Sequence, residues 1–153
     1  AGVIKELAKE NGRDLDGFHF ANDVDIYFTD DGEEAWNKMK NAVKVSLYKP
    51  ELLKVHNIPQ DSEFDFRRYF TEYAMNKPEL MEQMKRAALK IPDAVARTAI
   101  GVGKPDDVIQ MLERFIVAGT NHFIIRFWGE GYFKNIETFG NKVITYFRDR
   151  ARS

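Results

Sequence analysis

Three short apolar segments that alternate with helical patterns place the strongest constraint on how this chain folds. The segments are 17–29, 98–102 and 122–128, and a helical pattern follows each of them. The last segment, HFIIRFW, is almost continuously apolar, as strands are when both faces of a parallel sheet are covered. Strands that alternate with helices favour parallel β/α units. We therefore predict an α/β fold.

The helices are predicted from the spacing of their apolar residues and from the residues that begin them. Pro78 and Pro105 each stand at the first position of a predicted helix, where proline is well tolerated. Residues from about 50 to 97 form a long helical excursion between the first two strand candidates. The predicted helices are 2–11, about 32–48, 64–76, 78–90, 105–118 and about 135–149, with short turns at 50–56 and from Ile91.

Composition excludes several classes of protein. The 153 residues suggest one domain, and 23 basic against 24 acidic residues argue against nucleic-acid binding driven by positive charge. The absence of cysteine excludes disulfides and thiolate chemistry, and three histidines disfavour a conventional zinc site, so we predict no metal. No apolar run reaches the length of a membrane span, and the charged first residues are unlike a secretion signal. We expect a cytoplasmic protein whose first helix begins at a cut end.

Three parallel strands form an incomplete sheet, because two edges stay open and one face stays uncovered. A complete (β/α)8 barrel needs about 250 residues, roughly a hundred more than this chain has. The chain is therefore either part of a barrel or completes its sheet with another copy. We expect segments 98–102 and 122–127 to be adjacent and parallel, with the helix at 105–118 crossing between them in the right-handed sense.

The stretch AIGVGKPDDVIQMLERFIVAGTNHFIIRFW resembles the last barrel units of the bacterial luciferase-like monooxygenase family. The family pattern is a strand, a Gly-x-Pro-acidic-acidic-Val turn, an amphipathic helix that ends in Ala-Gly, and a strand that begins His-Phe. Here these features are residues 103–108, Ala118-Gly119 and His122-Phe123. Segments 4–14, 31–35 and 136–148 are similar to the family's preceding helix, next helix start and closing helix, and the loosest part is 50–90.

The resemblance implies a TIM barrel that uses FMN or the deazaflavin F420. Residues 1–153 would be a single domain, the C-terminal portion of a partial (β/α)8 barrel with about its last three β/α units and a helical insertion. Since earlier strands carry much of the family's cofactor site, the chain would be a fragment of a monooxygenase or other oxidoreductase, inactive alone. The alternatives are a non-enzymatic half-barrel interaction module that self-assembles through open sheet edges, and a small α/β ligand-binding domain.

If the chain is part of a barrel, apolar side chains that would face the barrel interior become exposed here. Phe18, Phe20 and Ile124 are the candidates. Apolar patches beyond a few hundred Å² usually mark an interface. We therefore expect a homo-oligomer. We also expect the protein to act on a small-molecule substrate, with neither nucleic acid nor a membrane as partner.

The loop between the second strand candidate and the following helix is a candidate anion site. Gly101, Gly103 and Lys104 precede a helix N-terminus, where free N–H groups and the helix dipole favour an anion. Loops after late barrel strands often bind phosphate. The alternative is that Asp106 and Asp107 simply offset the charge of an exposed Lys104.

Arg126 is the second candidate for cofactor or substrate binding. Alternation places Ile124 and Arg126 on one face of the strand, near the end where barrel active sites lie. Burying an unpaired charge is costly, so Arg126 either holds an anionic ligand or pairs with an inward carboxylate such as Asp25.

The loop after the last strand is the third candidate. Gly129 and Gly131, flanked by Trp128 and Tyr132, either line a pocket or cover the barrel end. No catalytic residue is identified, because Asp23 and Asp25 lack a partner base. His19 and His122 lie at the opposite strand ends, and structural roles are expected for them.

Overall fold

The computed structural model describes residues 2–60 and 77–152, which divide between two compact units. The strand unit comprises the residues up to Gly32 together with those from Ile100 onward. The helical unit comprises Glu33–Ala99. Each unit is described on its own below.

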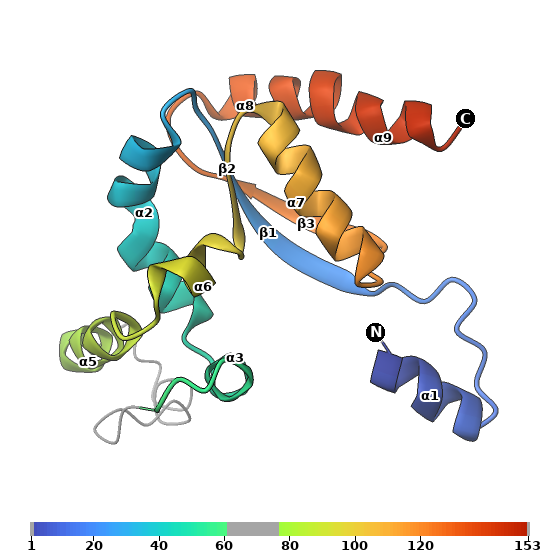
Figure 1. Cartoon of the computed structure of the whole chain (residues 1–153), viewed down its shortest axis with the longest axis horizontal. Helices are drawn as coiled ribbons and strands as arrows, with labels where there is room; N and C mark the ends of the chain where they lie inside the picture. Colours follow the sequence, from blue (N-terminus) through green and yellow to red (C-terminus); the bar gives the residue numbers. More distant parts are fainter. Residues whose placement is uncertain (1, 61–76, 153) are drawn as a thin grey trace. The chain divides into compact units, whose positions relative to one another are not determined.

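The strand unit contains one sheet of three parallel strands (Figure 1). They are β1 (Ala21–Phe28), β2 (Ile100–Gly103) and β3 (His122–Phe127), in the order β2-β1-β3. Asp25 of β1 is in register with Ile100 on one side and with Arg126 on the other. The mixed α/β fold and the three parallel strands predicted from the sequence are confirmed.

The predicted adjacency of 98–102 and 122–127 is wrong, because β1 lies between β2 and β3. A central strand of a parallel sheet is covered by two neighbours and suits the segment with most to bury. β1 is eight residues long and buries Val24, Asp25 and Ile26 at its centre, whereas β2 has four residues, two of them glycine.

The first strand is also shorter than predicted, because Phe18 and Phe20 precede it. The side chain of Asn121 takes the place of a neighbouring strand there. Its Oδ1 accepts a hydrogen bond from the Phe20 backbone N–H at 2.7 Å, and its Nδ2 donates to the Phe18 carbonyl at 2.9 Å. Phe18 and Ile124 are about half exposed, at 45% and 53%. Phe18 and Phe20 thus lie outside the three-stranded sheet.

Two helical elements pack against this sheet. They are α7 (Pro105–Val117) and a C-terminal run of α8 (Tyr132–Thr138), a π-helical turn η2 (Phe139–Ile144) and α9 (Thr145–Arg150). The first helix, α1 (Gly2–Glu10), precedes β1 and supplies no residue to the core cluster. The C-terminal run begins three residues before the helix predicted at 135–149 and includes a π-helical turn that periodicity did not predict.

The hydrophobic core of the strand unit lies between the sheet and these helices. Val24 and Ile26 of β1 pack with Val108 of α7 and Val143 of η2, all of them at most 1% exposed. The alternate β3 residues Phe123, Ile125 and Phe127 pack against the same core. The opposite face of β3 therefore carries Ile124 and Arg126, as the alternation predicted. Each fully buried aliphatic side chain contributes about 1.5–3 kcal/mol.

The helical unit holds most of α2 (Gly32–Leu47), together with α3 (Pro50–Val55), α5 (Pro78–Ala88) and α6 (Asp93–Arg97). The turn predicted at 50–56 is thus a short helix, because Pro50 stands at its first turn and Leu53 is fully buried. The helix predicted at 64–76 lies outside the described residues.

A buried cation organises the polar interior of the helical unit. Lys44 has a side chain only 10% exposed, and its Nζ lies 2.6 Å from Asp93 Oδ1. Trp36 Nε1 donates to the other carboxylate oxygen at 3.1 Å. The hydrogen bond from Lys44, followed by that from Trp36, lowers the pKa of Asp93. The Arg97 guanidinium lies 4.6 Å from the Trp36 ring centre and also pairs with Glu33.

We predict that Asp93→Asn destabilises the chain at neutral pH, because Lys44 loses its counter-charge while remaining buried. Since the folded-state pKa of Asp93 is depressed, its contribution is complete above the unfolded value of 3.8 and disappears as pH falls through the lower folded value. Urea unfolding over this acid range should therefore show a smaller loss of stability in the variant than in the unaltered chain.

Glu82→Gln is the matched control. The pKa of Glu82 is also lowered, first by a hydrogen bond from Lys85, but Lys85 is 54% exposed and stays hydrated without its partner. The control should change the free energy of unfolding less than Asp93→Asn. Equal effects of the two substitutions would show that the burial of Lys44 does not matter.

Candidate functional site

Arg126 of β3 is held by two aspartates of the neighbouring strand. Its Nε lies 2.8 Å and its Nη2 3.1 Å from the two oxygens of Asp25, and its Nη1 lies 2.9 Å from Asp23 Oδ2. The hydrogen bond to Asp25 is the main cause that raises the pKa of Arg126. The sequence suggested two roles for Arg126, binding an anionic ligand or pairing with Asp25. The ion pair with Asp25 is present in the structure.

Asp25 also anchors the loop that follows β3. Its side chain is 8% exposed, and its Oδ1 accepts a hydrogen bond from Trp128 Nε1 at 2.7 Å. The Trp128 backbone N–H donates to Ile26, and the Trp128 carbonyl accepts from Asn135 Nδ2 at 3.2 Å. Three contacts thus fix Trp128 at the carboxyl end of the sheet. Sequence reasoning missed Asn135, whose only signal was its place four residues after Gly131.

Gly129 and Gly131 shape the same loop. Both have positive φ angles, 86° and 76°, which residues with a Cβ rarely adopt. A Cβ on Gly129 would lie 2.8 Å from the ring of Tyr27, whereas one on Gly131 would approach nothing closer than 3.7 Å. Gly129 is therefore required by packing as well as by backbone conformation.

The turn between β2 and α7 is built around Asp107. Gly103 has a φ of 131°, and a Cβ there would collide with the Asp107 carboxylate. Asp107 Oδ2 accepts a hydrogen bond from the Lys104 backbone N–H at 2.8 Å, which caps the start of α7. Gly101 lies deeper, where a Cβ would come within 3.0 Å of Met111 Cε. Asp107 was expected only to offset the charge of Lys104, and its capping role was missed.

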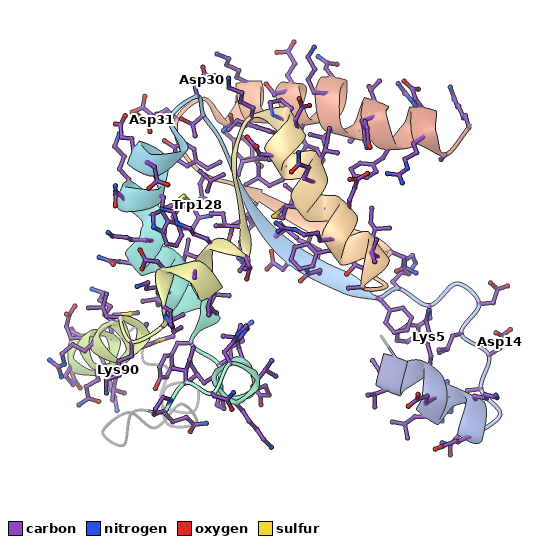
Figure 2. All side chains as sticks on the ribbon, viewed as in Figure 1. Lys5, Asp14, Asp30, Asp31, Lys90 and Trp128 are labelled. Atoms are coloured by element: carbon purple, nitrogen blue, oxygen red, sulfur yellow. The ribbon has the colours of Figure 1, made fainter. Side chains whose placement is uncertain are left out.

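Lys104 itself is exposed at the end of β2. Its Nζ lies 3.8 Å from Asp30 Oδ1, and Asp30 is almost fully exposed on the loop after β1 (Figure 2). An exposed pair at this distance contributes little to stability and exchanges readily with water or ions. The Lys104 amine therefore remains accessible to an anion.

The carboxyl ends of the strands enclose a polar pocket of about 260 Å³. Gly103 and Lys104 line it, as does Glu130 from the loop between the two glycines. Gly101, Arg126, Gly129 and Gly131 are not among its lining residues. The other residues that line it are Phe28, Thr29, Asp30, Pro105, Lys134, Asn135 and Thr138. We call it the strand-end pocket.

Within residues 2–60 and 77–152, no three or more His, Asp or Glu side chains come together as metal ligands would. Over the same described part of the chain, no helix combines the length and apolar character that crossing a membrane requires.

Comparison with known proteins finds a likeness to a solved structure. No family model matches the sequence, and no curated protein matches it. A solved structure, the coenzyme F420-dependent tetrahydromethanopterin reductase from Methanopyrus kandleri, aligns with a TM-score of 0.61 and 26% identity over 94% of this chain. This chain resembles an F420-dependent reductase. It covers 40% of the length of that reductase. The likeness agrees with the luciferase-like fold that the sequence resemblance implies.

We predict that Asp25→Asn lowers the free energy of unfolding by about 1.5–3 kcal/mol, the scale of a hydrogen bond to a charged group. Asp25 is buried and serves both Arg126 and Trp128, so an amide leaves at least one donor poorly matched. The control Asp23→Asn removes a half-exposed partner of the same Arg126 and should cost less than about 1 kcal/mol. Chemical denaturation measures both, and a larger loss in the control would contradict this account.

Gly129→Ala and Gly131→Ala separate backbone strain from packing. Both place a Cβ at positive φ, which costs about 1–2 kcal/mol. Only the first also forces the Tyr27 ring to move, so we expect a clearly larger drop in unfolding temperature for Gly129→Ala. Equal drops, measured by thermal unfolding, would mean that the ring moves without cost.

Proposed function

We propose that this chain forms part of an F420-dependent oxidoreductase with a luciferase-like barrel. The observation that carries the proposal is the structural likeness to the F420-dependent reductase over 94% of the chain at 26% identity. The family motifs in the correct order along the sequence, at 103–108 and 118–123 among others, support it independently.

Within this proposal, the strand-end pocket holds a polar, anionic part of the cofactor. Its volume of about 260 Å³ is small, since sites for whole ligands usually measure about 300–1,000 Å³. The amines of Lys104 and Lys134 supply hydrogen-bond donors, whereas the Asn135 amide already donates to the Trp128 carbonyl. Asp30 and Glu130 also line the pocket and oppose an anion, but Asp30 is 97% exposed, Glu130 is exposed as well, and both are free to turn toward water. The donor set therefore fits an anionic segment and leaves the redox ring to be held elsewhere.

When bound, the deazaflavin supplies hydride transfer, and the protein supplies binding and orientation. Lys104 binds the anion at the end of β2. Gly103 lets the backbone follow a path that a side chain would block, and Asp107 fixes that path from α7. Asp25, through Trp128, holds the loop that carries Glu130 into the pocket. Arg126 acts on this loop through Asp25 and is a positioning residue rather than a ligand.

The barrel part of the proposal rests on β1 and β3, which are parallel neighbours. In a closed barrel, neighbouring strands follow one another in chain order. Because β2 lies on the side of β1 opposite to β3, it does not fit this order. We propose that catalysis requires more of the protein than these 153 residues, because the remaining strands would complete the cofactor site. Within the same proposal, residues 1–153 form a single domain and the protein is a homo-oligomer.

The test is titration with F420 and, separately, with FMN, of this chain and of the longer gene product that contains it. We expect the longer protein to bind F420 more tightly than FMN, and Lys104→Ala to weaken F420 binding by about tenfold or more, the scale of a charged hydrogen bond. Lys142→Ala, an exposed lysine on the C-terminal helical run away from the pocket, is the control and should bind as before.

The possible outcomes test the proposed function and the proposed anion site separately. If the longer protein binds neither cofactor, the proposed function fails. If it binds F420 and Lys104→Ala makes no difference, the function stands and the strand-end pocket is not its anion site. Preferential binding of FMN would keep the flavoenzyme class and overturn the choice of F420.

A further inference from the structure

A second cavity in the strand unit shares no lining residue with the strand-end pocket. It is a groove of about 440 Å³ that lies between α7, β3 and the C-terminal helical run. Leu112 and Ile116 line it from α7, and Phe123 and Ile125 line it from β3. Phe139, Val143, Ile144, Phe147 and Arg148 complete it. We call it the helix groove, and eight of its nine lining residues are apolar.

The π-helical turn η2 forms one wall of this groove. Phe139, Val143 and Ile144 all belong to η2 and all line the cavity. A π-helical turn is rarer than an α-helical one; it occurs mostly as a single turn inside an α-helix, frequently at a functional site. Here the wider turn brings residues five apart, Phe139 and Ile144, to the same side of the helix. Ile144 nevertheless remains 51% exposed, so the apolar wall is left open to solvent.

Arg148 supplies the charged group of the groove. Within the described residues it forms no ion pair, and its guanidinium only approaches Thr145 Oγ1, at 3.4 Å. The carboxylate of Glu113 on α7 pairs with Arg150 and accepts a hydrogen bond from the Tyr146 hydroxyl. The apolar helix groove therefore ends at Arg148, whose positive charge forms no ion pair with the part of the chain that the structure describes.

We propose that the helix groove binds a small apolar carboxylate with an aromatic body. Small-molecule sites are typically clefts of about 300–1,000 Å³, mostly apolar, with few polar groups that fix orientation, and the groove meets each criterion. Phe123, Phe139 and Phe147 offer ring surfaces to an aromatic body. The Arg148 guanidinium matches a carboxylate through paired N–H groups. The site goes beyond the proposed cofactor function and does not depend on it.

The probe is 2-naphthoate, with the neutral 2-naphthamide as its isosteric partner, titrated into this chain by calorimetry. We expect saturable binding of one 2-naphthoate per chain and weaker binding of the amide. Arg148→Gln should weaken binding of the carboxylate by about tenfold, as expected on losing a charge-assisted hydrogen bond, and leave binding of the amide unchanged. Arg114→Gln, which alters an exposed arginine of α7 outside the groove, should bind like the unaltered chain.

A second pair of variants tests the apolar wall. Ile116→Glu places a charge on a groove residue that is 43% exposed, and it should abolish binding of both compounds. Val117→Glu, one residue along the same helix, 88% exposed and outside the groove, should leave binding intact. Because neither side chain is buried, neither substitution should prevent folding, and circular dichroism checks this.

Three results would overturn the proposal. One is the absence of saturable binding. Another is equal weakening of carboxylate and amide by Arg148→Gln, which would remove the role of the charge. The third is concentration-dependent self-association, seen by light scattering, that Ile116→Glu abolishes while 2-naphthoate does not compete with it. That last result would identify a second copy of the chain as the occupant.

Discussion

The strand unit depends on burying the middle of β1. Val24 and Ile26 point toward α7 and the C-terminal helices, while Asp25 points to the other face and brings a carboxylate almost out of contact with water. A buried carboxylate needs donors, and β3 supplies them in register as Arg126 and, just beyond the strand, Trp128. The pairing of β1 with β3 is thereby specified by charge as well as by apolar packing.

That interaction connects the sheet to its polar end. Trp128 is held by Asp25 and by Asn135, so the glycine loop after β3 leaves the sheet in a fixed direction and carries Glu130 to the strand-end pocket. On β2, Asp107 caps α7 and fixes Gly103 and Lys104 at the same end. Accessible charge is thus presented on a rigid base, the arrangement by which α/β proteins build binding sites at the carboxyl ends of parallel strands.

The two cavities of the strand unit have opposite character, and their positions explain why. The strand-end pocket is made of loop residues, where backbone groups and charged side chains meet water. The helix groove lies where two helical elements diverge over β3, so its walls are residues that would otherwise be core. A π-helical turn in one wall widens the helix there. One unit therefore contains a polar pocket and an apolar groove that share no lining residue.

Local sequence determined the elements themselves. Short apolar segments identified the three strands, and Pro78 and Pro105 marked where two of the helices begin. Alternation along the last strand placed Ile124 and Arg126 on one face and raised Asp25 as a partner for the arginine. These features follow from side-chain periodicity and backbone restriction within a few residues, so they can be read without knowing the fold.

Tertiary structure alone decided how the elements are arranged. Strand order depends on which strand gains most from the central position, a competition among distant segments that placed β1 rather than β2 in the middle. The ion pair of Arg126 with Asp25 follows from the register of two strands separated by 101 residues in the chain. The capping role of Asp107, the tether through Asn135 and the π-helical turn likewise arise from packing geometry. Sequence fixes local conformation through short-range sterics, whereas order, register and cavities result from the packing of the chain as a whole.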